Sequence, residues 1–256
     1  MDINIKEKNL LGINSLGRIG KLSVWYHLMS RKFDGIVINV GREVGQTLED
    51  FIHTLCYDST YGPLRFFMNG RCGEDLKIET PDRENLVFSI NGFPIKVLIS
   101  DRNPQDINWK KEGVRLVVDC TGKFLDPTQP ADNPKGSLKG HLVAGAQKVI
   151  CSAPFKIKGT EPNANELYPT LIYGINHECY DPLRHNIVSA ASCTTTGLAP
   201  DEFITSNKID FVAHDDIPYT GDGIDDIYGW LKAKGMFVAT DRTEGKLTKK
   251  KPPITR

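Results

Sequence analysis

The chain has no long apolar run and no net charge. Its 256 residues contain no stretch approaching the roughly 18 apolar residues that a membrane-spanning helix needs. Lys plus Arg and Asp plus Glu each number 32, a balance that argues against a general nucleic-acid binder or a membrane-surface protein. The first ten residues, MDINIKEKNL, lack the apolar region of a signal peptide. We therefore expect a cytoplasmic protein with neither a membrane nor a specific nucleic-acid partner.

Paired cysteine motifs and metal-ligand spacings are also missing. The six cysteines form no CxxC pair, which fits a reducing compartment better than a disulfide framework. The histidines show no spacing typical of metal ligands, so we predict no metal site. We expect five of them to lie on the surface: His27, His53, His141, His177 and His185.

A strand, a glycine-bearing turn and a helix open the chain. Residues 10–14 form a short apolar run, and helical spacing of apolar residues begins at Ile19. This is the setting of the GxGxxG dinucleotide fingerprint, whose glycines let the backbone approach a pyrophosphate at the helix N-terminus. Ser15 stands at the first glycine position, a departure because this turn favours a residue without Cβ.

The rest of the first 200 residues alternates between strand and helix patterns. Strands are predicted at 10–14, 35–40, 114–120, 148–152, 171–176 and 186–188, with a hairpin over 87–99 around Asn91-Gly92. Helices are predicted from residue 19, over 47–56 and over 138–146. The fold class is therefore α/β: a Rossmann-like, mainly parallel sheet with helices on both faces. A ligand is expected at the carboxyl ends of the strands.

The end of the second strand leaves the choice of dinucleotide open. An acidic residue normally binds the adenosine ribose about twenty residues beyond the fingerprint. This chain has Val40 there, followed by Gly41, Arg42 and Glu43. Arg42 is a candidate ligand for a 2′-phosphate, although we favour the alternative that Arg42 and Glu43 are solvated loop charges. The cofactor is thus NAD or NADP.

Cys193 lies in the segment SAASCTTTGLAP, between a strand end and a helix start. Backbone N–H groups and the positive end of the helix dipole favour a thiolate there, and the thiolate is the nucleophile. The alternative is a buried structural cysteine, because free cysteine is among the most buried residue types.

Several motifs in order resemble one enzyme family. SAASCTTTGLAP resembles the active-site segment SNASCTTNCLAP of glyceraldehyde-3-phosphate dehydrogenases, and INSLGRIG resembles their INGFGRIG. YDSTYG, DRNP, TG, SAP and GINHE are similar to further segments of that family. The resemblance runs from about residue 10 to residue 200. It implies an oxidoreductase that transfers hydride from a cysteine-bound aldehyde to NAD or NADP.

The resemblance also implies roles for individual residues. Cys193 matches the catalytic nucleophile, and Ser192 and Thr194 match hydroxyls that help to hold the phosphate of a small phosphorylated aldehyde. The expected partners are this aldehyde, a dinucleotide, and either a second copy of the chain or full-length dehydrogenase subunits. The expected cofactor-binding residues are Asn14, Gly17, Arg18, Ile19, Gly20, Arg102, Thr121, Gly122 and Ser152.

The sequence departs from that family after about Pro200. Only 63 residues follow Cys193, too few for the family's catalytic domain with its histidine base. Residues 201–245 instead resemble CTP:phosphocholine cytidylyltransferases, through KIDFVAHDDIPY and RTEG. The family's HxGH motif, which stabilises the transferring phosphate, is absent. The resemblance implies a phosphocholine pocket and a CTP-phosphate ligand from four residues: His214, Asp215, Tyr219 and Arg242.

The predicted organisation has three parts. Residues 1–200 form the dinucleotide-binding domain and end with the cysteine segment, residues 201–245 are the cytidylyltransferase-like α/β fragment, and residues 246–256 are a basic tail expected to be disordered. The first interpretation is a dehydrogenase-like protein with impaired or no activity. The alternatives are a non-catalytic nucleotide-binding or subunit-pairing module, and a fusion product without a selected function.

Overall fold

The computed structural model describes residues 9–41, 47–71, 73–99, 102–158, 162–192 and 194–196. The chain divides into two units, residues 1–192 and 193–256, and the fold below is that of the first.

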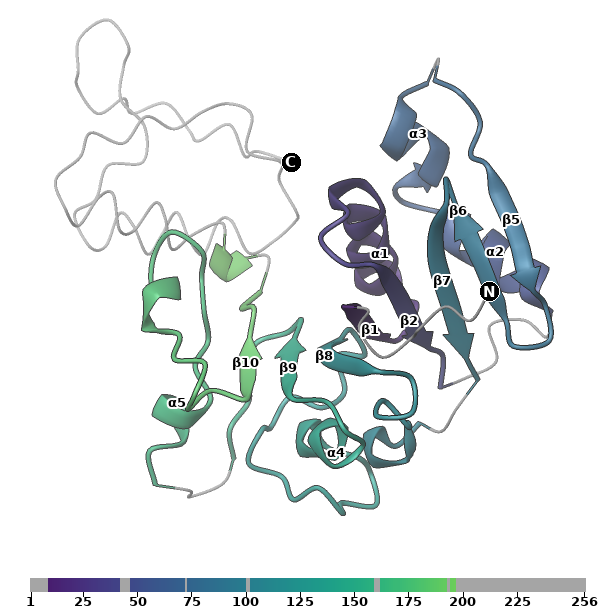
Figure 1. Ribbon diagram of the computed structural model, residues 1–256. Helices are drawn as coiled ribbons and strands as arrows, with labels where there is room; N and C mark the ends of the chain where they lie inside the picture. The colour runs from purple at the N-terminus through teal and green to yellow at the C-terminus, as the bar shows by residue number, and fades with distance from the viewer. Residues whose placement is uncertain are drawn as a thin grey trace, which may run out of the picture. The chain divides into compact units, whose positions relative to one another are not determined.

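An eight-stranded sheet forms the centre of this unit, in the order β10-β9-β8-β1-β2-β7-β6-β5 (Figure 1). The pairs from β10 across to β7 are parallel, whereas β7, β6 and β5 are antiparallel at one edge. The sheet is therefore Rossmann-like and mainly parallel, as the sequence predicted. The strands are β1 (Leu10–Asn14), β2 (Gly35–Asn39), β5 (Ile78–Asp82), β6 (Val87–Ile90), β7 (Phe93–Leu98), β8 (Val114–Asp119), β9 (Lys148–Cys151) and β10 (Ile187–Ser189).

The helices are short, apart from the one that follows β1. Thr47 caps α2 with a reciprocal capping box, in which its hydroxyl accepts from the Asp50 N–H and the Asp50 carboxylate accepts from the Thr47 N–H. No helix in the described ranges is long and apolar enough to span a bilayer. The elements are α1 (Arg18–Ser30), α2 (Leu48–Cys56), α3 (Leu64–Asn69), α4 (Leu138–Val143), α5 (Ala164–Leu167), the 3₁₀ turns η2 (Pro104–Asp106) and η3 (His177–Cys179), and a two-stranded ribbon of β3 (Tyr57–Asp58) and β4 (Gly62–Pro63).

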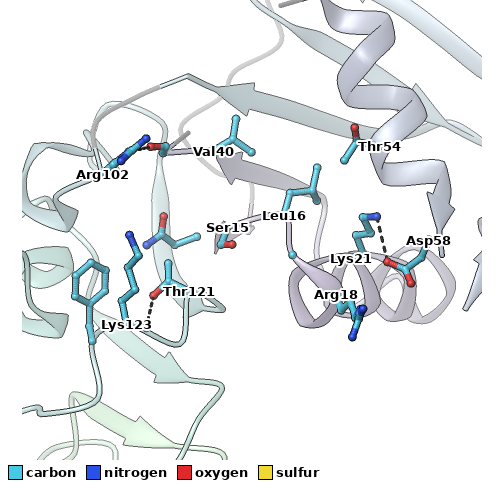
Figure 2. Close-up of a pocket in the computed structure, with 14 residues that line it drawn as sticks. Ser15, Leu16, Arg18, Lys21, Val40, Thr54, Asp58, Arg102, Thr121 and Lys123 are labelled. Carbon is cyan, nitrogen blue, oxygen red and sulfur yellow. Dashed lines mark hydrogen bonds and ion pairs between the residues drawn. The ribbon is translucent and has the colours of Figure 1, made fainter. Parts of the chain in front are cut away.

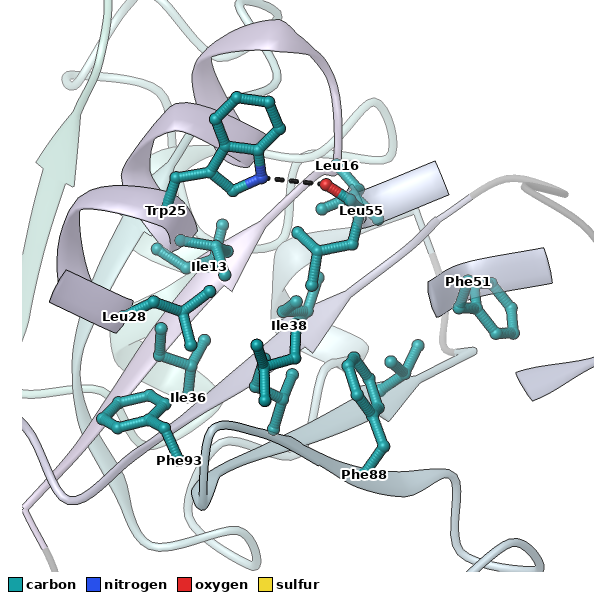
Figure 3. Close-up of a cluster of buried hydrophobic side chains, with 14 of the residues drawn as sticks. Ile13, Leu16, Trp25, Leu28, Ile36, Ile38, Phe51, Leu55, Phe88 and Phe93 are labelled. Atoms are coloured by element: carbon teal, nitrogen blue, oxygen red, sulfur yellow. Dashed lines mark hydrogen bonds between the residues drawn. The ribbon is translucent and has the colours of Figure 1, made fainter. Parts of the chain in front are cut away.

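Side chains alternate along each strand, and in the central strands both faces are covered by hydrophobic clusters. In β2, Ile36 and Ile38 belong to the hydrophobic cluster that includes α1 and α2, whereas Val37 belongs to a second cluster with α4. Figure 3 shows Trp25 and Leu28 of α1 over the isoleucines of β1 and β2. Burial on both faces explains why the central strands read as continuous apolar runs.

Of two local predictions, the hairpin around Asn91-Gly92 is confirmed and the strand at 171–176 is wrong. The Asn91-Gly92 hairpin is present, with positive φ angles of 49° and 75° that suit its tight turn. Residues 171–176 do not form the predicted strand. The Asn176 side chain accepts from the Ile172 N–H and donates to the Thr170 carbonyl, which folds this segment into a turn.

The surface placement predicted for the histidines is wrong at two positions. His141 is fully buried and His185 nearly so. Both rings have hydrogen-bond partners that satisfy them in the interior: the Trp109 indole and the Asp119 carboxylate at His141, and the Asp181 N–H at His185.

Candidate functional site

A pocket of about 650 Å³ opens at the carboxyl ends of β1, β2 and β8 (Figure 2). This is where an open parallel sheet is expected to bind a ligand, since the chain reverses its direction of winding there. The lining consists of Asn14, Ser15, Leu16, Gly17, Arg18, Lys21, Val40, Gly41, Thr54, Asp58, Arg102, Thr121, Lys123 and Phe124.

The N-terminus of α1 forms one wall of the pocket. No side chain caps this helix and its first turn holds no acidic residue. The first intrahelical bond runs from the Lys21 N–H to the Gly17 carbonyl, at 2.9 Å. The amides of the preceding residues therefore have no acceptor within the helix, and they suit an anionic ligand.

Two positions of the turn show how tightly it packs. A Cβ on Gly20 would lie 2.1 Å from the Ser15 carbonyl oxygen, so only glycine lets α1 approach the end of β1 this closely. Ser15 itself has φ +90°, in the region that favours glycine. The chain thus keeps the turn of the glycine fingerprint although a serine occupies its first position.

The charged groups around the pocket are mostly cationic. Figure 2 shows Arg102 and Lys123 on one side, and Arg18 with the Lys21–Asp58 pair on the other. The Lys21 ammonium lies 3.1 Å from the Asp58 carboxylate and also donates to the Tyr57 carbonyl. Asp58 is the single acidic residue in the lining, so the described wall carries a net positive charge that favours a polyanion.

The end of β2 carries an arginine contact in place of a carboxylate. Val40 is buried, and its N–H donates to the Leu98 carbonyl at 3.0 Å. Arg102 Nε donates to the Gly41 carbonyl at 2.7 Å. This bond holds the guanidinium, a planar group with five N–H donors, at the strand end.

A buried carboxylate lies beneath the floor. Asp119, at the end of β8, accepts from the Asn14 amide at 2.8 Å and from both the N–H and the hydroxyl of Thr121, at 3.1 and 2.6 Å. Its other close neighbour is His141 Nε2, at 3.0 Å. Burial acts to raise the pKa of Asp119, but the hydrogen bonds from His141, Thr121 and Asn14 prevail and hold that pKa below its ordinary value.

The structure brings five of the predicted cofactor-binding residues to the pocket: Asn14, Gly17, Arg18, Arg102 and Thr121. The other four, Ile19, Gly20, Gly122 and Ser152, do not line it. Gly20 acts through its close approach to Ser15, and the Ser152 N–H donates to the Asp119 backbone carbonyl at 3.0 Å.

The remaining site predictions concern residues that the structure does not join to this pocket. Ser192 is half-buried and ends the first unit, whereas Thr194 is exposed and belongs to the second. Five predicted site residues lie outside the described residues: Cys193, His214, Asp215, Tyr219 and Arg242.

Sequence reasoning missed part of the lining, above all Lys21, Asp58 and Lys123. Lys21 lies two residues after the start of the predicted helix and Lys123 directly follows the TG turn, so a search for cations near the fingerprint and the turn would have found both. Asp58 belongs to the YDSTYG segment, whose position beside α1 depends on packing between elements.

The fold and the pocket define a Rossmann-like α/β domain with a cation-lined pocket at the carboxyl edge of its sheet. Residues 10–127 match the family model described as glyceraldehyde 3-phosphate dehydrogenase, NAD binding domain. The chain is 35% identical over 198 residues to glyceraldehyde-3-phosphate dehydrogenase 1 of Bacillus subtilis (strain 168), covering 77% of this chain and 49% of that protein.

Two further relatives show the same pattern. The glycosomal glyceraldehyde-3-phosphate dehydrogenase of Crithidia fasciculata is 32% identical over 192 residues, covering 74% of this chain and 47% of that protein. The enzyme of Streptomyces coelicolor (strain ATCC BAA-471 / A3(2) / M145) is 35% identical over 190 residues, covering 74% and 46%. These matches confirm the dehydrogenase part of the resemblance, and the chain spans about half the length of these relatives.

Proposed function

We propose that the pocket binds a dinucleotide, NAD or NADP, with the pyrophosphate at the N-terminus of α1. The uncapped start of this helix, beside the close contact of Gly20 with Ser15, is the observation that carries the proposal. The surrounding cations favour the same ligand, and a volume of about 650 Å³ lies within the usual range for small-molecule sites. The similarity of residues 10–127 to an NAD binding domain supports the assignment.

We further propose that the pocket accepts NADP as well as NAD. A carboxylate at the end of β2 would bind the ribose hydroxyls and repel a 2′-phosphate, but Val40 occupies this position. The Arg102 guanidinium is held at the same strand end by its bond to Gly41. Arginine stays charged and matches phosphate geometry with two parallel donors, so Arg102 is the residue that favours the 2′-phosphate.

Calorimetric titration of the full chain with each dinucleotide tests both proposals. We expect both ligands to bind, and the Arg102→Ala variant to lose about tenfold in NADP affinity but less than threefold in NAD affinity. Arg65→Ala, which removes a guanidinium outside the pocket lining, is the matched control and leaves both affinities unchanged. No heat and no thermal stabilisation at millimolar cofactor would contradict dinucleotide binding and would favour the interpretation as a fusion product.

We propose that the 256-residue chain binds the cofactor without efficient phosphorylating dehydrogenase turnover. The reaction of the resembling family needs a thiolate, a base and a bound substrate phosphate at one place. Cys193 matches the nucleophile, but the dehydrogenase resemblance runs only to about residue 200, and residues 201–245 resemble another family and not the family's segment with the histidine base. A bound dinucleotide would supply the hydride acceptor for oxidation of a Cys193-bound aldehyde, and that oxidation also needs a base to take the hydroxyl proton.

Substrate and subunit partners follow from the same similarity and stay predictions. A small phosphorylated aldehyde is the proposed substrate class for any residual activity, and a second copy of the chain or a full-length dehydrogenase subunit is the proposed protein partner. The cytoplasm is the proposed location. The cytidylyltransferase resemblance of residues 201–245 also stays a prediction, since it falls outside the described residues.

A further inference from the structure

His141, the buried histidine beneath the pocket, has hydrogen-bond partners that allow only one position for its ring proton. The Trp109 indole N–H lies 2.9 Å from His141 Nδ1. An indole nitrogen only donates, so His141 Nδ1 must accept. The ring proton therefore sits on Nε2, which faces the Asp119 carboxylate at 3.0 Å.

This arrangement completes a shell of donors around one carboxylate. Asp119 Oδ2 accepts from His141 and Asn14, and Oδ1 accepts twice from Thr121. Asp119 and His141 are both at least 99% buried, so the carboxylate relies on these donors for its stability. A missing donor would leave part of a buried anion unsatisfied, and the remaining donors would have to shift.

The groups that Asp119 holds are groups of the pocket. Asn14 and Thr121 both line it. The Asn14 amide is fixed at both ends, by Asp119 at Nδ2 and by the Asn39 amide at Oδ1, 2.8 Å away. The Thr121 hydroxyl gives its proton to Asp119 and accepts from the Lys123 N–H at 3.2 Å. Toward a ligand it can therefore offer only its second lone pair, an acceptor that suits a ribose hydroxyl.

We propose that His141 is a positioning residue for the dinucleotide site. Through the Nε2–H bond to Asp119 it keeps the Asn14 amide and the Thr121 hydroxyl in the orientation that the ligand meets. His141 is not among the residues that line the pocket, so it is proposed to act through Asp119. The inference deepens the proposed function and rests on it.

The test compares two replacements of His141 in the full chain. His141→Gln retains an N–H donor for Asp119 but removes the ring acceptor of Trp109, whereas His141→Leu removes the donor and the acceptor. Trp25→Phe is the matched control, because it breaks another buried indole bond, the 2.8 Å contact with the Leu55 carbonyl, away from the pocket lining. Free energies of unfolding and cofactor dissociation constants are measured for all of them, well below each melting temperature.

We expect all three variants to lose stability but only His141→Leu to lose affinity, by about tenfold for the better-bound dinucleotide. His141→Gln and Trp25→Phe should stay within about threefold of the wild-type affinity, although they too lose a buried hydrogen bond. A merely structural role predicts instead that affinity follows stability in every variant.

Two results overturn the inference and leave the proposed function standing. In the first, His141→Leu binds the cofactor as tightly as wild type; in the second, His141→Leu and His141→Gln lose cofactor affinity equally. Absence of binding by the wild-type chain overturns the proposed function, and this inference with it.

Discussion

Replacing Ser15 with glycine should stabilise the protein. Ser15 has φ +90°, and a non-glycine residue held in a sparsely populated backbone region costs about 1–3 kcal/mol. The change also makes the unfolded chain more flexible, which offsets about 0.4–1 kcal/mol of that gain. We expect a net stabilisation of about 1 kcal/mol, equivalent to an increase of about 2–4 °C in melting temperature for a unit of this size.

The assay is urea unfolding followed by tryptophan fluorescence, which reports on the buried Trp25 and Trp109. Ser15→Ala is the matched control: it keeps Cβ and therefore the strain, so its free energy of unfolding should stay within about 0.5 kcal/mol of wild type. Gly92→Ala measures the opposite change, since Gly92 has φ +75° and open space where a Cβ would stand. It should destabilise by about 1 kcal/mol.

Ser15→Gly should also strengthen cofactor binding. Removing Cβ from the turn lets a pyrophosphate come closer to the amides at the start of α1, so we expect NAD affinity to rise severalfold. A Ser15→Gly variant that is no more stable than Ser15→Ala would refute the argument from backbone strain. A more stable variant with unchanged affinity would refute only the argument about phosphate approach.

Three further predictions follow. The folded-state pKa of Asp119 is depressed, so its stabilising contribution should be complete above the ordinary value of 3.8 and lost as the pH falls through the folded pKa. Asp119→Asn should therefore lower the free energy of unfolding by about 2 kcal/mol or more at neutral pH. In acid unfolding curves, the difference in stability between this variant and wild type should shrink. Burial raises the pKa of the Cys56, Cys120 and Cys151 thiols to about 11, 12 and 11, so limited iodoacetamide should label these three slowly, and the exposed Cys179 is the competitor of Cys193. Its predicted helix-start position should make Cys193 react first, and preferential labelling of Cys179 or another cysteine by mass spectrometry would refute its assignment. Turnover with glyceraldehyde-3-phosphate and NAD or NADP should be at least about 10³-fold below that of the full-length relatives, and ordinary rates that Cys193→Ser abolishes would show that a base lies elsewhere.

The sequence by itself determined the central parallel strands and the start of the site. Apolar runs at 10–14, 35–40 and 114–120 correspond to β1, β2 and β8, because strands buried on both faces carry apolar residues without alternation. The order of strand, turn and helix placed α1 correctly, and the fingerprint located Gly17 and Arg18 at the pocket. These signals are local, so they can be read from neighbouring residues.

Only the tertiary structure decided which distant side chains share the site. Asp119 meets Asn14 across 105 residues because β1 and β8 are parallel neighbours, and it meets His141 because α4 packs on the same end of the sheet. Lys21 of α1 meets Asp58 of β3 across 37 residues because the packing of the elements brings them together. A buried histidine or aspartate has the same local sequence signature as a solvated one. Its role is set by the donors and acceptors that the packed elements bring to it, and neither periodicity nor a short motif encodes them.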